Sequence, residues 1–331
     1  MRRKSKTDYI RYAAAVILVI SLMAIALLLL NYWEKQQGFF QGEEKEISLH
    51  HNIVHDGKKY TLRTDIETIL FIGVDKFSSE VDNSSYNNDQ QADFLMLMVI
   101  DRKKGTASAI QFNRDTMAEM DILGIGGKKV GTVNAQLALS HTYGSGGKDS
   151  CLNTQKAISR FLGGAFIDHY IAVTMDSVQI INDLVGGVTL EVMHDFSDVD
   201  PSLVKGETVT LKGEKALMYI RGRQSVEEQS NVQRMERQNQ YLQALKAAVK
   251  TYASKNNRFS SDAVLKLADH MVTDYSFDLL DDVLEKMLTY DITEIHTIEG
   301  ELKEGEHYME FYADAKAKKQ LVVDLFYRLN E

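Results

Sequence analysis

Residues 94–101 read FLMLMVID, a continuous apolar run that ends in an acid, and this stretch decides the fold. The run is long enough to form a strand that is buried on both faces. Lys103-Lys104-Gly105 predicts a turn after it, and residues 107–112 predict the next strand. Residues 68–74 form a similar β-rich run ahead of it. Strands of this kind indicate a central sheet that is covered on both faces.

Strand-like and helix-like patterns alternate over the rest of the chain. Apolar residues three and four apart predict helices at 133–143, 152–161, 176–185, 212–220, 233–253, 260–271, 277–290 and 313–329. Short apolar runs predict further strands at 169–174, 188–192, 206–211 and 295–301. Ser150 or Asn153 is expected to cap the helix at 152–161. We therefore predict an α/β fold with a central mixed β-sheet flanked by helices on both faces, in one domain over residues 66–331.

The composition is that of a globular protein that does not bind nucleic acid. The chain has 331 residues, of which 44% are apolar and 26% charged, and this balance excludes a mostly disordered chain. The formal net charge is −9, whereas a nucleic-acid-binding protein needs a basic face. The single cysteine, Cys151, excludes an intramolecular disulfide and a zinc site built from cysteines.

The N-terminal residues differ from this average. Residues 1–12 hold five cations and one acid, and residues 13–30 contain Ser21 as their only polar member. Eighteen helical residues span about 27 Å, which is nearly the thickness of a bilayer core. Tyr12, Tyr32 and Trp33 stand at the two ends of this run, where amphipathic aromatic residues favour the membrane interface.

We therefore predict a membrane anchor that is not cleaved. Residues 1–12 are expected to form a cytoplasmic tail, 13–33 a single transmembrane helix, and 34–65 an extracellular stalk with a hairpin around Asp56-Gly57. This arrangement places the main domain outside the cell. The alternative of a cleaved signal peptide requires a shorter apolar core followed by small residues, but Asn-Tyr-Trp-Glu-Lys follows here.

Arginines and acids stand at the ends of predicted elements. They are Asp75, Asp93, Arg114, Asp115, Arg221, Arg223, Arg234 and Arg237, and Gln238 follows directly. Ligands of open α/β sheets bind outside the carboxyl ends of the strands, and guanidinium groups match phosphate oxygens bidentately. Carboxylates among the arginines make sense if Mg²⁺ bridges them to phosphate. Taken singly, each residue is explained equally well as a loop salt bridge or part of a solvated helix face.

In combination, these segments resemble the LytR-CpsA-Psr family of cell-envelope proteins. The matching pieces are Phe71-Ile-Gly-Val-Asp75, Ala92-Asp93, Asn113-Arg114-Asp115-Thr116, Val133-Asn134-Ala135, Asp183-Leu-Val-Gly-Gly-Val188, Leu211-Lys-Gly-Glu-Lys-Ala-Leu217, Tyr219-Ile-Arg-Gly-Arg223 and Arg234-Met-Glu-Arg-Gln238. The resemblance covers roughly residues 66–249. It also matches the order of a short cytoplasmic tail, one membrane span and an outer domain.

The resemblance implies a phosphotransferase. Such proteins move a glycopolymer phosphate, from teichoic acid, capsule or a similar polymer, from an undecaprenyl-pyrophosphate carrier to peptidoglycan. By motif position, Asp75 and Asp93 would hold Mg²⁺ (or Mn²⁺) or activate the attacking hydroxyl, and Asp115 has a less defined role. The residues that would bind the pyrophosphate are Arg114, Arg221, Arg223, Arg234 and Gln238, and Arg114 would also take part in catalysis. An apolar pocket of the domain would hold the lipid tail.

Two positions depart from the family pattern. Gln91 stands where the family commonly has arginine, and Asn231 stands where it often has aspartate. These lost charges leave two further functions open: a regulator that binds polyprenyl phosphates without catalysis, and a hydrolase that transfers the group to water.

Overall fold

The computed structural model describes residues 49–77, 90–198, 200–222, 231–306 and 308–330. The chain divides into two units, Met1–Ile47 and Ser48–Glu331, and the second contains all of the described residues. The predicted membrane anchor at 13–33 lies outside them. Within the described residues, no helix combines the length and the apolar character needed to cross a membrane.

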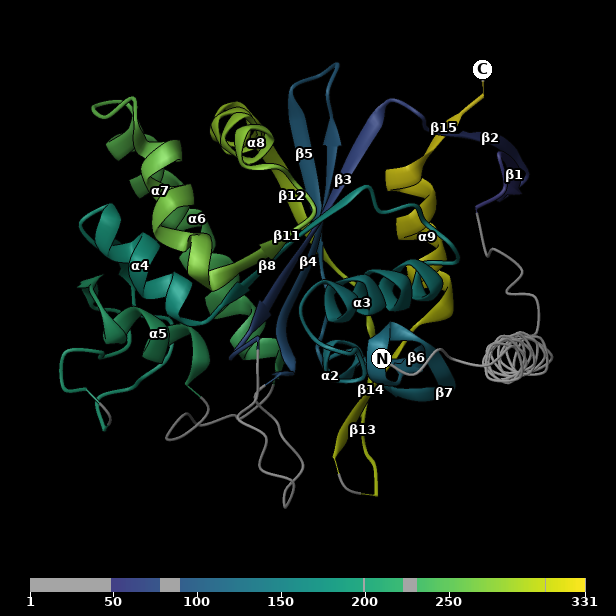
Figure 1. Ribbon diagram of the computed structural model, residues 1–331, viewed down its shortest axis with the longest axis horizontal. Coiled ribbons are helices and arrows are strands. Elements are labelled where there is room, and N and C mark those ends of the chain that lie inside the picture. The colour runs from purple at the N-terminus through teal and green to yellow at the C-terminus, as the bar shows by residue number, and fades with distance from the viewer. Residues whose placement is uncertain (1–48, 78–89, 199, 223–230, 307, 331) are drawn as a thin grey trace, which may run out of the picture. The chain divides into compact units, whose positions relative to one another are not determined.

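A mixed sheet forms the centre of the domain (Figure 1). Its strands, in the spatial order β11-β8-β3-β4-β5-β12, are Met271–Thr273, His169–Thr174, Ile66–Val74, Ala92–Asp101, Thr106–Gln111 and Asp291–Thr297. β3 pairs antiparallel with β4 and parallel with β8. β5 pairs antiparallel with β4 and parallel with β12. The predicted mixed sheet is thus confirmed.

Helices cover both faces of this sheet (Figure 1). α3 (Gly147–Phe161) and α9 (Ala315–Phe326) pack on the face that presents Leu70 and Ile72 of β3. α7 (Phe259–Leu267) and α8 (Phe277–Thr289) pack on the face that presents Ile69. Successive residues of β3 therefore contribute to opposite cores, as the period of a strand requires. The expectation of helices on both faces is confirmed.

A second, smaller core lies beside the sheet. It is built from α4 (Asp176–Leu184), β9 (Val188–Glu191), β10 (Thr208–Leu211), α5 (Glu214–Arg221) and the long α6 (Asn231–Ala253). Tyr219 is fully buried there and its ring lies 5.8 Å from that of Phe196. This core fixes the carboxyl end of α5 and the first turns of α6, which carry predicted site residues.

The helix predicted at 133–143 is largely wrong. β7 (Lys129–Gln136) occupies its first part and pairs with β6 (Met117–Leu123), and only α2 (Leu139–Thr142) is helical. The cap prediction is also wrong, because Ser150 and Asn153 are buried inside α3. Asn153 instead donates hydrogen bonds to the carbonyls of Asp121 and Ser140, at 3.0 and 2.8 Å. The spacing of apolar residues did not distinguish a strand followed by a short helix from one helix.

The C-terminal part also divides differently from the prediction. The strand predicted at 295–301 is split between β12 and β13 (Gly300–Glu304), and β13 pairs with β14 (Met309–Ala313). The helix predicted at 313–329 ends at Phe326, where β15 (Tyr327–Leu329) begins. The helix predicted at 260–271 ends at Leu267, before the 3₁₀ turn Ala268–His270. A second 3₁₀ turn spans Ile125–Gly127.

The hairpin predicted around Asp56-Gly57 is confirmed. β1 (Asn52–His55) pairs with β2 (Lys58–Leu62), and β2 also pairs with β15 near the C-terminus. The compact unit therefore begins ahead of the predicted boundary at residue 66. The N-terminal hairpin and the last helix close one side of the domain together.

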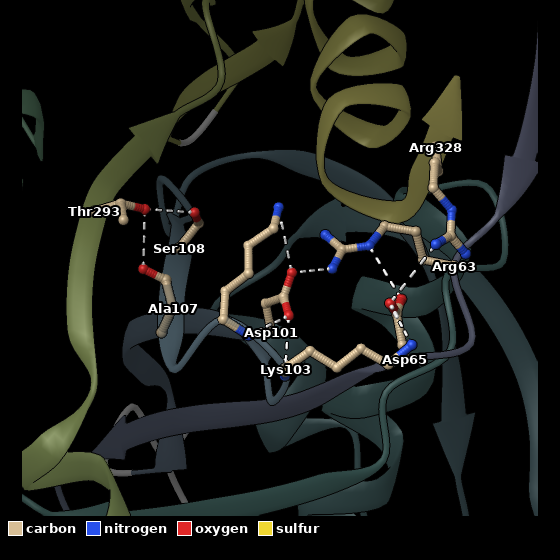
Figure 2. A network of polar contacts seen from close by, with 9 residues as sticks. Arg63, Asp65, Asp101, Lys103, Ala107, Ser108, Thr293 and Arg328 are labelled. Carbon is tan, nitrogen blue, oxygen red and sulfur yellow. Dashed lines mark hydrogen bonds and ion pairs between the residues drawn. The ribbon is translucent and has the colours of Figure 1, made fainter. Parts of the chain in front are cut away.

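A polar network links the same region to the central sheet (Figure 2). The Arg63 guanidinium donates to Asp101 at the end of β4, with a distance of 2.6 Å between Nη2 and Oδ2. Asp101 also accepts the backbone N–H groups of Lys103 and Lys104, which closes the turn into β5. Thr293, the bulge residue of β12, donates to the Ala107 carbonyl at 3.2 Å.

We expect Asp101→Asn to lower the free energy of unfolding by about 1–3 kcal/mol at neutral pH, since a buried, charge-assisted hydrogen bond is lost. Burial acts to raise the pKa of Asp101, but the Lys104 N–H and the Arg63 guanidinium outweigh it, so this pKa lies below the ordinary 3.8. A carboxyl group whose pKa is lowered by folding stabilises the fold at pH values above its ordinary pKa. This contribution is lost as the pH falls. Urea unfolding of both proteins should therefore converge at low pH, whereas the exposed control Asp198→Asn should match the native protein throughout.

Candidate functional site

The predicted site residues gather at one edge of the central sheet. β3 and β5 are both antiparallel to β4, so the carboxyl ends of β3 and β5 meet the start of β4 at the same edge. Asp75 follows β3 directly, and Asp93 is the second residue of β4. Arg114 is the third residue after β5. The topology therefore brings together three segments that are far apart in the sequence.

A β-bulge sets the direction of Asp93. Gly73 pairs with Phe94 and Val74 pairs with Ala92, so Asp93 is the extra residue in this register. Such an extra residue turns its side chain out of the regular alternation. A Cβ atom on Gly73 would lie 2.9 Å from Cβ of Phe94. The glycine between Ile72 and Val74 is thus required by the close approach of the two strands.

The Asp93 carboxylate binds two guanidinium groups. Arg114 Nη1 donates to Asp93 Oδ1, and Arg234 Nη1 of α6 lies 3.7 Å from the same oxygen. Arg114 Nη2 donates to the side-chain oxygen of Gln91. Arg114 and Arg234 are both buried, with exposed fractions of 9% and 5%. One acid thus holds two buried cations at the sheet edge, and Gln91 contributes a hydrogen bond to this cluster.

The loop that carries Arg114 is braced on its other side. Asp115 Oδ1 lies 3.7 Å from Arg114 Nε and accepts a hydrogen bond from Gln136 at 3.1 Å. The Asn113 side chain accepts the N–H of Asp115 at 3.0 Å. The backbone N–H of Phe311 in β14 donates to the Asp115 carbonyl at 2.9 Å. Asp115 therefore joins the Arg114 loop to β7 and β14.

A second acid–arginine pair lies at the end of β3. Arg221 Nη2, at the last residue of α5, lies 2.8 Å from Asp75 Oδ2. The Arg221 side chain is 46% exposed and that of Asp75 24%. The other oxygen, Asp75 Oδ1, is buried and accepts no hydrogen bond from any described residue. This oxygen is available to a ligand or a cation.

Gln238 and its neighbour Arg237 play different parts. Gln238 accepts a hydrogen bond from Gln111, the last residue of β5, at 3.1 Å. Arg237 points away from this cluster and donates to the carbonyls of Tyr219 and Gly222, at 3.1 and 2.6 Å. Burial lowers the pKa of Arg237. Arg237 thus fixes the end of α5, which positions Arg221, a role that the sequence did not indicate.

Arg223 lies outside the described residues, so its part in the site stays a prediction. The structure brings Asp93, Arg114, Arg234 and Gln91 into one cluster and pairs Asp75 with Arg221. Gln91 was read in the sequence only as a lost cation, and its contact with Arg114 shows a further role. Its position ahead of Asp93 was the available signal.

The described residues contain no group of three acids, histidines or cysteines that could hold a metal ion by itself. Asp75 offers one buried carboxylate oxygen, and the Asp93 carboxylate is turned to guanidinium groups. Mg²⁺ commonly takes one or two carboxylates and completes its shell with water and phosphate oxygens. The site therefore fits Mg²⁺ only together with a phosphate ligand.

The profile of the LytR_cpsA_psr family matches residues 35–325, which is most of the chain. The chain belongs to this family. The match covers each of the predicted site residues, and it extends past residue 249, where the resemblance in the motifs ends.

Curated relatives in this family carry names that state a transfer reaction. The chain is 28% identical over 230 residues to the polyisoprenyl-teichoic acid–peptidoglycan teichoic acid transferase TagV of Bacillus subtilis, covering 65% of this chain and 53% of TagV. It is 28% identical over 249 residues to TagU of Bacillus licheniformis, covering 74% and 70%. The matched part thus spans about half the length of TagV.

Solved structures share the fold. The crystal structure of Bacillus subtilis TagV superposes with a TM-score of 0.58 at 22% identity, covering 80% of this chain and 97% of that one. The Streptococcus agalactiae protein gbs0355 gives 0.62 at 18% identity, covering 79% and 88%. A structure of TagT bound to LI-WTA gives 0.57 at 19% identity, covering 79% and 90%.

We expect Arg114→Ala to weaken the binding of inorganic pyrophosphate by about tenfold or more, because a charge-assisted contact with phosphate is removed. Titration calorimetry on the full-length protein would measure this. Arg102→Ala is the matched control, since Arg102 is exposed and stands at the opposite end of β4, beside Glu67. Equal affinities of the native and Arg114→Ala proteins would show that the cluster is not an anion site.

Proposed function

We propose that this protein transfers a glycopolymer phosphate from an undecaprenyl-pyrophosphate carrier to peptidoglycan. The observation that carries the proposal is the buried cluster in which Arg114 and Arg234 share the Asp93 carboxylate. Membership of the LytR_cpsA_psr family, with relatives named as teichoic acid transferases, supports the same reaction.

The cluster concentrates guanidinium groups at a buried place. Arg114 and Arg234 both approach Asp93, and Arg114 also lies 3.7 Å from Asp115. Pyrophosphate oxygens match the donor geometry of arginine, so a pyrophosphate can take the place of a carboxylate at these guanidinium groups. Arg114 and Arg234 would therefore bind the donor and stabilise the charge that develops on the transferred phosphoryl group.

The proposed step exchanges one phosphorus–oxygen bond for another. The hydroxyl oxygen of an acceptor sugar forms a bond to the glycan-linked phosphorus, and the bond to the bridging oxygen of the pyrophosphate breaks. Undecaprenyl phosphate leaves with that oxygen. The hydroxyl proton passes to a carboxylate, and Asp75 offers a buried oxygen that accepts no hydrogen bond from the described residues. Arg221 holds the other Asp75 oxygen and so fixes the carboxylate.

A magnesium ion would assist at the same place. As the alternative to acting as the base, Asp75 Oδ1 would hold Mg²⁺ or Mn²⁺, with Asp93 nearby and phosphate oxygens as further ligands. The ion would supply Lewis-acid stabilisation of the transferring phosphate. In its absence, Arg221 keeps the carboxylate oriented.

The lipid tail needs an apolar space close to these residues. Phe71 and Val173 belong to β3 and β8, which are interior strands of the sheet. Their side chains lie on the face that packs against α7 and α8, and both remain partly exposed. Phe71 lies four residues ahead of Asp75, so this partly exposed apolar face is near the site in the sequence. This supports its use by a polyprenyl chain.

The proposal includes a place for the protein in the cell. A lipid-linked donor and a peptidoglycan acceptor meet at the outer face of the cell membrane. Residues 13–33 would anchor the chain there, with residues 1–12 in the cytoplasm and the domain outside.

We expect the native protein to transfer a labelled glycan phosphate from a polyprenyl-pyrophosphate donor to peptidoglycan, with a requirement for Mg²⁺. Arg114→Ala should lower the rate by about 10²–10³, the usual loss when a group that stabilises the transition state is removed. Arg102→Ala should leave the rate unchanged, since Arg102 lies at the far end of β4.

The same assay distinguishes the transferase from a hydrolase and from a regulator that only binds the lipid. Release of free glycan phosphate without attachment to peptidoglycan would identify a hydrolase and overturn the transferase. Gln91 favours the binding-only regulator as the second candidate, since its neutral side chain occupies a place beside Arg114 where relatives commonly have arginine. Tight lipid binding without turnover, together with a gain of turnover in Gln91→Arg, would show that regulator.

We expect Val173→Trp to weaken the binding of undecaprenyl phosphate in detergent micelles by about tenfold, because a larger ring fills the apolar space. Val54→Trp on the exposed face of β1 serves as the control. Unchanged binding by the Val173→Trp protein, with native thermal stability, would contradict a lipid site on this face.

A further inference from the structure

A cavity lies beside β14, the strand that binds the Arg114 loop. Its volume is about 290 Å³, and β6, β7, β14, α3 and α9 border it. The side chains that line it include Met117, Glu119, Asn134, Arg160, Phe161, Tyr312 and Lys318. Asn134 belongs to Val133-Asn134-Ala135, one of the sequence motifs to which the transfer reaction gives no part. The volume is near the lower limit of about 300 Å³ for ligand pockets, so it accepts a single ring.

Lys318 contributes a positive charge to this cavity, and Glu119, the acid of the lining, pairs with Arg160 instead. Its ammonium group lies 4.3 Å above the Phe161 ring, and it forms no ion pair with any described residue. Burial lowers the pKa of Lys318, and no neighbouring acid counteracts this. Arg160, in contrast, pairs with Asp121 at 3.2 Å and with Glu119 at 3.5 Å. A half-buried cation that lacks an acid partner in the protein is suited to an acid in a ligand.

The remaining walls suit a sugar. Tyr312 is 41% exposed and forms one wall beside the Phe161 ring. The C–H groups of a pyranose form apolar faces that pack on aromatic rings. The exposed Asn134 amide can both donate and accept hydrogen bonds, as the hydroxyl and acetamido groups of an amino sugar require. The cavity thus combines an aromatic surface, an amide and a cation.

The cavity is close to the reacting end of the sheet. Thr116 forms a bridge with Phe311, and Met117 and Tyr312, the next residue of each segment, border the cavity. Met117 is three residues from Arg114, which is about 10 Å along an extended chain. Arg234 of α6 approaches Asp93, the partner of Arg114, whereas Phe311 of β14 donates to the Asp115 carbonyl. A ligand on the β14 side therefore leaves the α6 side to the lipid-linked donor.

We propose that this cavity binds an amino sugar of the acceptor peptidoglycan strand whose lactyl group carries no peptide, with the free lactyl carboxylate on Lys318. The proposal rests on the proposed transfer reaction and names the part of the protein that positions the acceptor. The strand then runs from the cavity toward Arg114, and a neighbouring sugar presents its hydroxyl to the phosphate.

Binding measurements on the full-length protein in detergent micelles test this. The probes are a peptidoglycan disaccharide with a free lactyl carboxylate and the methyl ester of the same disaccharide. We expect the native protein to bind the acid about tenfold or more tightly than the ester, since a charge-assisted hydrogen bond is involved. Lys318→Met should remove this preference and Lys318→Arg should restore it. The control Lys316→Met, on an exposed residue of the same helix, should keep it.

Two results would overturn the proposal: equal binding of acid and ester by the native protein, or an undiminished preference in Lys318→Met. Asn134→Ala, a change at an exposed residue, provides a second binding measurement. It should weaken the binding of the acid and of the ester equally. In the transfer assay, Lys318→Met should raise the KM for peptidoglycan while donor binding stays native. Transfer with an unchanged acceptor KM would keep the proposed function and exclude this cavity, whereas a carboxylate preference without transfer would keep the cavity and exclude the function.

Discussion

The site depends on one carboxylate that holds two buried guanidinium groups together. Without Asp93, Arg114 and Arg234 would repel each other in a region from which water is largely excluded. With it, the two guanidinium groups stay close together, and Arg114 also lies 3.7 Å from Asp115. A buried cation that lacks such a partner is costly, so the acid is as necessary to the site as the arginines are.

Several surrounding elements position the acids and arginines of the site. The bulge at Asp93 turns the acid out of the sheet, and Gly73 allows the strands to approach closely enough for it. β14 braces the Arg114 loop through the Asp115 carbonyl. Arg237 holds the end of α5, from which Arg221 reaches Asp75. The Arg114 loop thus contacts Asp93 through its guanidinium group and β14 through the Asp115 carbonyl.

Several features were predictable because they depend on local pattern. The strand β4 follows from a continuous apolar run and β3 from a β-rich one, since a strand buried on both faces needs such residues. The segment that became β7 and α2 was misread, because its apolar spacing fits a helix equally well and only the pairing with β6 selects the strand. Asn153 was misread as a cap because its two carbonyl partners come from distant segments.

The sequence by itself determined the α/β class, the mixed sheet and the residue types of the site, because periodicity and motif order are properties of the chain alone. It also indicated an anion-binding function, because arginines with acid partners stood at the ends of strands. Only the tertiary structure decided that Asp93 serves Arg114 and Arg234 together, that Arg237 supports α5, and that Lys318 lies without an acid over an aromatic ring. These contacts join residues that are far apart in the sequence, and their partners are chosen by strand register and helix packing, which local pattern does not fix.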